Sequence, residues 1–432
     1  MFEHIRGRTA LSISLIALLA VTGCLPGTER TGARRVDIGE PPTTASQAVL
    51  DNRLFPGFEL AFEVRIDSTP FVVGGTFVGS VFPRDGDSQL SFYGFNATGT
   101  IWRVDTNPSC VGTVATRVGD EAAIVILDSD ASQNRQGGVS ITVATAFSAA
   151  DAEPLWGPTE VPGPSPGSGL IFANTPKALT NERTPATLLD AASGAVVDGP
   201  VGMALYEYHG TALEGTADSF SAIDSRSGDT LWSSAQLGPG FIDVNAGISA
   251  RFDGDYGPST GNILILNWID SAGKSVAVLH DFRTGAALGQ VDGIPSGEAT
   301  VDDVTQTVLL TSQRTSGAYR ITAVRAGKGV IWTRDSDSPI VTSATGAGVL
   351  YAQADGQSVT MDLDTGKTLT SGKYVLPIAV LPDGTALFPT NQPEVYTVAH
   401  PTESRWPSAP KIRCTRTQAE SRTDSFNRPV CL

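Results

Sequence analysis

Closely spaced aspartates are the side chains in this 432-residue sequence that come nearest to a metal site. Asp128 and Asp130 are followed at the same spacing by Ser132 and Asn134, which gives an alternating series of oxygen donors. Ca²⁺ prefers such ligands, but a complete calcium loop also has a late glutamate that binds through both oxygens. Because that glutamate is missing, the pattern indicates only a weak calcium candidate at Asp128 and Asp130, and a solvated loop is the alternative.

Residues for acid–base or nucleophilic catalysis are scattered. His209, His280 and His400 lie far apart along the chain. Two G-x-S-x-G patterns, at 163–167 and 257–261, lie in stretches that read as loops, whereas a nucleophile elbow needs a strand, a sharp turn and a helix. We therefore predict no catalytic residue.

The N-terminus has the pattern of an export signal. Arg6 and Arg8 precede an apolar run, residues 10–21, that is too short for a stable membrane span. The run ends at residues 21–24, Val-Thr-Gly-Cys, which resemble the lipobox of bacterial lipoproteins. The resemblance implies a diacylglycerol and an acyl chain such as palmitate on Cys24, enough to anchor the protein at the extracytoplasmic face of the cell membrane. A plain secretory signal with an incidental cysteine is the alternative.

A turn of the form Asp-x-x-Thr-Gly recurs with variations through the rest of the chain. Its copies end at Gly99, Gly194, Gly228, Gly285, Gly327 and Gly366, and a degenerate copy without the glycine covers 147–151. The mean spacing is about 44 residues, close to the blade length of propeller repeats. Glycine supplies the positive φ of the turn and the aspartate caps its amides. A four-stranded sheet cannot bury both faces alone, so such units stack radially into a ring.

Four tryptophans occupy equivalent positions after these turns, namely Trp102, Trp156, Trp232 and Trp332. We expect each to pack between neighbouring sheets. The pattern predicts an all-β fold, a single β-propeller of seven or eight four-stranded blades, with eight favoured. The segment 58–66 is expected to join the C-terminal strands and close the ring. An open β-sandwich with coincidental turns is the alternative.

The turn-plus-tryptophan units over about 58–400 resemble the repeats of quinoprotein-type β-propellers, including the pyrroloquinoline-quinone (PQQ) alcohol dehydrogenases and the lipid-anchored propeller of the outer-membrane barrel assembly machinery. The dehydrogenases hold Ca²⁺ against the quinone and have an adjacent cysteine pair beside it. This sequence has no Cys-Cys dipeptide, which puts the dehydrogenase activity in doubt. The resemblance implies the fold more strongly than the function.

The predicted organisation is a lipoprotein signal peptide at 1–23, a flexible tether from the lipidated cysteine at 24–52, the propeller at 53–400 and a C-terminal tail at 401–432. In the tail, Cys414 and Cys431 are favoured as a disulfide pair. Cys110 with either of them is the alternative, because the last strand of a propeller returns beside the first blade. The tail has a net positive charge and is expected to fold back over the propeller.

The amino-acid composition limits the classes of partner. The net charge of −15 disfavours a nucleic-acid partner. Arginine outnumbers lysine 24 to 6, as in high-GC bacteria such as actinobacteria. Irregular segments at 160–169 and 238–261 are candidate contact loops.

The sequence therefore predicts a non-enzymatic, lipid-anchored extracytoplasmic β-propeller, a binding or scaffold module in bacterial cell-envelope assembly or in the handling of envelope lipid or glycolipid. Its expected partners are the membrane, through the lipid anchor, and an envelope protein, lipid or glycolipid, and we expect no cofactor. The alternatives are a divergent PQQ-type dehydrogenase and a sensor that binds a solute or lipid headgroup.

Overall fold

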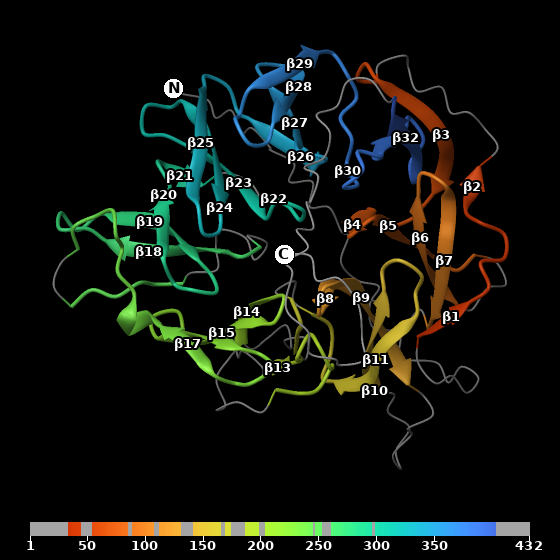
Figure 1. Ribbon diagram of the computed structural model, residues 1–432, viewed down its shortest axis with the longest axis horizontal. Coiled ribbons are helices and arrows are strands. Elements are labelled where there is room, and N and C mark those ends of the chain that lie inside the picture. The colour runs from red at the N-terminus through yellow and green to blue at the C-terminus, as the bar shows by residue number, and fades with distance from the viewer. Residues whose placement is uncertain are drawn as a thin grey trace, which may run out of the picture.

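The computed structural model describes residues 33–44, 54–84, 89–107, 112–130, 141–165, 169–173, 186–197, 204–244, 247–252, 261–295 and 299–402. Regular structure in these residues is β-strand, apart from one 3₁₀ turn, Ser234–Gln236. Antiparallel sheets follow one another around a ring (Figure 1). The described residues include no helix with the length and apolar character of a membrane span.

Seven sheets of three to five strands form the blades. Blade 1 contains β4 (Phe71–Val73), β5 (Thr76–Val81), β6 (Leu90–Asn96) and β7 (Gly99–Thr106), and blade 2 contains β8 (Thr113–Val118), β9 (Glu121–Asp130), β10 (Ile141–Ser148) and β11 (Pro154–Val161). Blade 3 contains β14 (Ala204–Tyr208), β15 (Thr211–Gly215), β16 (Phe220–Asp224) and β17 (Thr230–Ser233), and blade 4 contains β18 (Ile263–Ile269), β19 (Ser275–Asp281) and β20 (Ala287–Gln290).

The remaining blades continue the ring. Blade 5 contains β22 (Thr300–Asp302), β23 (Thr307–Gln313), β24 (Tyr319–Arg325) and β25 (Gly329–Ser336), with β21 (Ile294–Pro295) also paired to β23. Blade 6 contains β26 (Val341–Gly346), β27 (Val349–Ala354), β28 (Gln357–Asp362) and β29 (Thr368–Gly372), and blade 7 contains β30 (Ala379–Val380), β31 (Ala386–Pro389), β32 (Val395–Pro401) and β3 (Phe58–Arg65).

A smaller sheet of two strands, β12 (Ile171–Ala173) and β13 (Ala186–Leu188), lies between blades 2 and 3 (Figure 1). It carries its own repeat turn, which ends at Gly194. The ring therefore has eight positions, and seven of them hold a blade of three or more strands in the described residues. The prediction of a single propeller with seven or eight blades is confirmed, with seven blades in the described residues and not the favoured eight.

Blade 7 closes the ring by combining the two ends of the folded body. The N-terminal strand β3 pairs antiparallel with β32, from Phe58 opposite Pro401 to Arg65 opposite Val395. Strand β3 is the outer strand, and β30 is the inner one. The expected role of residues 58–66 in closing the ring is thereby confirmed.

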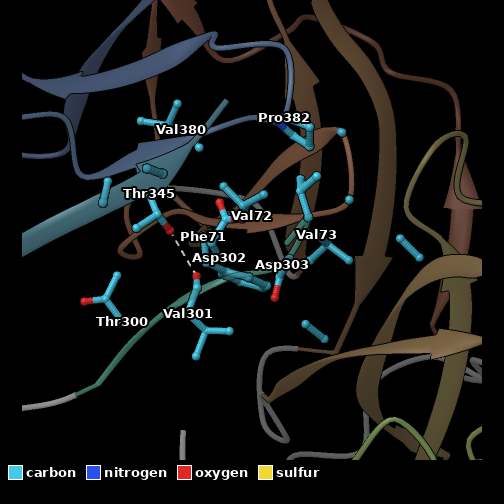
Figure 2. Close-up of a pocket in the computed structure, with 18 of the residues that line it drawn as sticks. Phe71, Val72, Val73, Thr300, Val301, Asp302, Asp303, Thr345, Val380 and Pro382 are labelled. Atoms are coloured by element: carbon cyan, nitrogen blue, oxygen red, sulfur yellow. Dashed lines mark hydrogen bonds between the residues drawn. The ribbon is translucent and has the colours of Figure 1, made fainter. Parts of the chain in front are cut away.

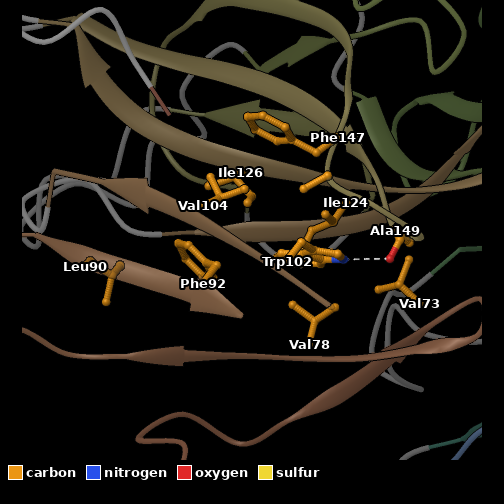
Figure 3. Packing of buried hydrophobic residues seen from close by; sticks show 11 residues of the cluster. Val73, Val78, Leu90, Phe92, Trp102, Val104, Ile124, Ile126, Phe147 and Ala149 are labelled. Carbon is orange, nitrogen blue, oxygen red and sulfur yellow. Dashed lines mark hydrogen bonds between the residues drawn. The ribbon is translucent and has the colours of Figure 1, made fainter. Parts of the chain in front are cut away.

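The hydrophobic core lies between neighbouring sheets. In the first interface, Phe92 and Trp102 of blade 1 pack with Ile124, Ile126 and Phe147 of blade 2, and all five are buried (Figure 3). Each blade thus buries one face against each neighbour, and this is why the strands read as nearly continuous apolar runs.

The four repeat tryptophans join consecutive positions of the ring by hydrogen bonds. Each indole N–H donates to a backbone carbonyl in the next repeat turn: Trp102 to Ala149 at 2.8 Å, Trp156 to Ala191 at 2.9 Å, Trp232 to Phe282 at 2.9 Å and Trp332 to Leu363 at 2.8 Å. Figure 3 shows the first of these bonds. The acceptor is always the second residue of the turn, so the same contact recurs around the ring.

The turn glycine has two tasks, which Gly366 illustrates. Its φ is +68°, a conformation that residues with a side chain rarely adopt. A Cβ there would also lie 2.7 Å from the ring of Trp332. The degenerate turn of blade 2 has Ala152 in the same place, with φ +56° and the same backbone bond, from its N–H to the Ser148 carbonyl. The turn geometry is therefore retained without the glycine.

Residues 33–44, which the sequence places in a flexible tether, include two short strands on the outside of the ring. β1 (Arg34–Val36) pairs with β7, and β2 (Thr43–Thr44) pairs with β3. Outer strands present unpaired backbone groups, and these segments cover part of two such edges. Arg35 also forms an ion pair with Glu153 of blade 2. The predicted tether at 24–52 is corrected for this segment, which belongs to the folded body.

We predict that Trp232→Phe lowers the free energy of unfolding by about 1–3 kcal/mol, because it removes the indole donor from the buried Phe282 carbonyl while keeping an aromatic ring. Urea denaturation followed by circular dichroism measures the change. Phe241→Leu, at a side chain that is 54% exposed, is the control and should have little effect. Equal stability of the wild type and Trp232→Phe would contradict a stabilising role for the bond.

Candidate functional site in the central channel

The innermost strands of the blades enclose a cavity at the centre of the ring. It has a volume of about 590 Å³ and is lined by β4, β8, β22, β26 and β30, together with His209 at the end of blade 3. Figure 2 shows Val72, Val301 and Val380 around it, with Asp302 and Asp303 beside them. We call it the channel pocket. Its size falls within the range of small-molecule sites.

A second cavity of about 290 Å³ adjoins the channel pocket toward blade 3. It is lined by residues of β8, by Ser165 and Gly169, and by residues 206–209. We call it the side pocket. The two cavities share four lining residues, Ala115, His209, Val301 and Asp303. They therefore form one connected site.

The turn between β14 and β15 places His209 in the site. This two-residue turn consists of His209 and Gly210, with φ values of +47° and +85°, as in hairpin turns that usually contain asparagine or glycine. The imidazole stacks on Tyr208, with ring centroids 3.9 Å apart. Burial, and the nearby positive charge of Arg117, lower the pKa of His209 to about 4. His209 is thus neutral at pH 7.

The end of β22 places two aspartates beside the channel, and their environments differ. Asp302 is buried, and its Oδ2 accepts hydrogen bonds from the Thr305 amide at 2.8 Å and hydroxyl at 2.6 Å. Asp303 is exposed to the channel and surrounded by protein on its other sides. Desolvation, and then the charge of Asp302, raise the pKa of Asp303 to about 6. Asp303 therefore titrates just below neutral pH.

Arg117 of β8 supplies the positive charge of the site. It is half-buried, and its Nη2 donates to the Asp120 carbonyl at 2.8 Å. Its charge influences the pKa values of Tyr208, His209 and Asp303, so it lies within electrostatic range of all three. It forms no ion pair with Asp303 within the described ranges. The two opposite charges are thus near one another but separate.

Glu207 forms the buried wall of the side pocket. Its side chain accepts hydrogen bonds from the Leu170 amide at 2.7 Å and the Gly210 amide at 2.8 Å, which ties the two-stranded sheet to blade 3. These bonds favour the ionised form, but desolvation outweighs them and raises the pKa of Glu207 to about 7. Glu207 is therefore a carboxyl group that is partly protonated at neutral pH.

The Ca²⁺ that the resemblance to quinoproteins implies does not fit these residues. The Asp302 carboxylate is engaged by Thr305, and the cationic Arg117 lies within range of Asp303, where it would repel a metal ion. No group of three or more His, Cys, Asp or Glu side chains is placed to hold a metal within the described part of the chain. The arrangement is suited instead to binding a polar organic ligand.

Residues singled out from the sequence fall elsewhere. Asp128 is buried, and its Oδ1 accepts hydrogen bonds from the Asn107 amide at 2.9 Å and the Ser129 amide at 2.7 Å. The side chain of Asp130 lies outside the described part, as do Cys24, Cys110, Cys414 and Cys431, so the lipidation and disulfide predictions stay predictions.

Two of the histidines have other partners. His280 is buried between the Gly285 carbonyl and the indole of Trp268, which suits a neutral ring. His400 lies 3.6 Å from Glu59. Of the three histidines, only His209 reaches the channel.

The two irregular segments that the sequence singled out as candidate contact loops both contribute residues to the side pocket. In 160–169, Ser165 and Gly169 border the side pocket, so this segment does contribute to the site. In 238–261, Gly261 also lines the side pocket, while Ile242 packs against the core between blades 3 and 4 and Phe241 is exposed; residues 253–260 lie outside the described part.

Comparison with solved structures gives distant likenesses. No family model and no curated protein matches the chain. A europium-containing methanol dehydrogenase is 13% identical, with 76% of this chain and 84% of that one covered and a TM-score of 0.35. Sqt1 of Saccharomyces cerevisiae is 8% identical, with 81% of this chain and 99% of that one covered and a TM-score of 0.36. A eukaryotic initiation factor is also 8% identical, with 88% of this chain and 100% of that one covered and a TM-score of 0.34. These values carry no argument about function.

We predict that raising the pH from about 5 to about 8 lowers the stability of the protein through Glu207. Between its ordinary pKa of 4.5 and the folded value of about 7, the folded protein holds a proton that the unfolded chain releases, so the free energy of unfolding falls as pH rises through this window. The contribution of this group is roughly 2–4 kcal/mol.

Urea denaturation across this pH range, on the wild type and Glu207→Gln, measures the contribution. The variant should be less stable at pH 5, because its amide nitrogen cannot accept a backbone hydrogen bond, and its stability should depend less on pH. Asp218→Asn, at a side chain that is 73% exposed, is the control. Identical pH profiles for the wild type and Glu207→Gln would refute the assignment.

Proposed function

We propose that this protein is a non-enzymatic binding module, held at the extracytoplasmic face of a bacterial cell membrane by lipid on Cys24, and that the central channel takes up a small ligand or an exposed group of an envelope component. The observation that carries the proposal is the channel pocket of about 590 Å³, which is bounded by the inner strands of five blades.

The composition of the channel wall supports binding. Apolar side chains such as Val72 and Val380 line the pocket (Figure 2), and the polar groups of Arg117, His209 and Asp303 line it as well. Small-molecule sites generally combine an apolar wall with a few placed polar groups that fix orientation. Because the polar groups come from blades 2, 3 and 5, a ligand there would contact several blades at once.

Binding is favoured over quinone-dependent oxidation on two grounds. The sequence lacks the adjacent cysteine pair that the resemblance implies beside the quinone. In the channel, the donor set around Asp302 and Asp303 does not suit Ca²⁺, as described above. The channel would therefore serve recognition, and the partners would be an envelope lipid, glycolipid, protein or solute rather than a substrate to be oxidised.

Native mass spectrometry of the protein purified from its host's membranes tests the binding function. We expect an additional small-molecule mass on the folded chain, and Ala115→Trp should abolish it, because Ala115 lines both pockets and a bulky ring there fills the shared space. Ala272→Trp, in an exposed turn of blade 4, is the matched control and should keep the ligand. A bare polypeptide mass for the wild type would contradict the proposal.

The anchor has a separate test. Cys24→Ser should move the protein from the membrane fraction to the soluble extracytoplasmic fraction and abolish incorporation of labelled palmitate, because the serine cannot form the thioether to diacylglycerol. Cell fractionation with metabolic labelling measures both. Unchanged membrane association and labelling of Cys24→Ser would exclude the lipid anchor at this residue.

A further inference from the structure

The channel pocket contains a cation and an anion that do not neutralise one another. Arg117 comes from β8 of blade 2, and Asp303 follows β22 of blade 5, so they belong to opposite parts of the ring wall. They are close enough for the charge of Arg117 to influence Asp303. Within the described residues no ion pair joins them. The space between them belongs to the cavity.

Both groups have capacity left for a ligand. Within the described ranges, the Arg117 guanidinium makes one hydrogen bond, from Nη2 to the Asp120 carbonyl, although it carries five N–H donors. The Asp303 carboxylate accepts no hydrogen bond there, in contrast to its neighbour Asp302. The Asp303 side chain is exposed to the channel, where a ligand can reach it. Each charge would gain from an oppositely charged partner.

Besides this pair, the described lining of the channel pocket contains one further charged side chain, Asp302, whose negative charge acts on Asp303. His209 is neutral at pH 7, and the Tyr208 hydroxyl donates to Gln306 Oε1 at 3.1 Å. Asp302 is occupied by Thr305. The remaining lining combines apolar side chains such as Val72 and Val380 with neutral hydroxyl groups such as Thr345, which donates to the Val301 carbonyl at 3.1 Å (Figure 2). A ligand with only a negative charge would be attracted by Arg117 and repelled by Asp303. A ligand with only a positive charge would be attracted by Asp303 and repelled by Arg117.

We propose that the channel pocket binds a zwitterionic ligand, whose anionic group accepts hydrogen bonds from Arg117 and whose ammonium group donates to Asp303. This inference rests on the proposed function of the channel as a ligand site and adds the chemical class of the ligand. The same pair of charges occurs in free amino-acid-like solutes and in lipid headgroups that combine a phosphate with an ammonium group.

Calorimetric titration of the full-length protein with small probes tests the proposal. Phosphoethanolamine and glycine carry both charges, whereas inorganic phosphate and ethanolamine carry one each. At least one of the two zwitterions should bind about tenfold or more tightly than both single-charge probes, because each charged hydrogen-bonded contact is worth a factor of about ten to a hundred. Preference for glycine would indicate a solute, and preference for phosphoethanolamine, with binding to phosphatidylethanolamine vesicles, a lipid headgroup.

Two substitutions assign the ends of the ligand. Arg117→Gln should reduce the affinity for the zwitterion to about that of ethanolamine, and Asp303→Asn should reduce it to about that of phosphate. Arg226→Gln and Asp355→Asn, at exposed turn residues away from the channel, are matched controls and should leave affinity unchanged. Thermal melting verifies that all four variants fold.

The outcomes separate this inference from the proposed function. If a ligand is retained in native mass spectrometry but zwitterions bind no more tightly than single-charge probes, the channel is a ligand site and the zwitterion proposal is wrong. The same conclusion holds if Arg117→Gln and Asp303→Asn bind the zwitterion like the wild type. If the purified protein carries no ligand and none of the probes binds, both proposals fail.

Discussion

The hydrogen bond from each repeat tryptophan to the next turn is the interaction on which the ring depends. A propeller blade contacts only its neighbours, so its orientation is set by what crosses each interface. The apolar faces supply most of the burial, but apolar packing is not directional. The indole N–H is directional, and it reaches a carbonyl at the same turn position in each of the four interfaces where it occurs. At these four interfaces it therefore restricts the angle between neighbouring sheets as well as joining them.

This constraint explains why the fold could be predicted from the sequence while the site could not. The turn, its glycine and the tryptophan are local and recur at a regular spacing, so each copy strengthens the interpretation of the others. The ring-closing strand could also be predicted, because the C-terminal strands lack a fourth member that residues 58–66 can supply. Arg117, Glu207 and Asp303 belong to no motif, and they converge only because three inner strands meet at the centre. The inner strands β22 and β30 have three and two residues, which are too few to show the alternation of apolar and polar residues that identifies a strand.

Residues 33–44 are the part of the fold for which the local sequence gave a wrong prediction, that of a flexible tether. Residues 33–44 have little apolar periodicity, so they read as a linker. They become ordered because the outer strands β7 and β3 have free backbone groups at their edges, and pairing with such an edge needs no apolar side chains. Each short polar strand pairs with the edge of a strand that is distant in the sequence. The sequence of the short strand alone does not identify that partner.

Closure by β3 and β32 has a consequence for how the chain reaches its final form. These strands are separated in the sequence by almost the whole propeller. Strand β3 is made first among the blade strands, but it cannot pair until β32, the last one, has been made. Until residues 395–401 have emerged, the growing protein is an open arc with an apolar face at each end, and its last pairing has the highest loop-closure cost of the fold. The ring therefore closes only after nearly the whole propeller has been made, and loss of a few C-terminal strand residues would leave the arc unclosed instead of shortening it by one strand.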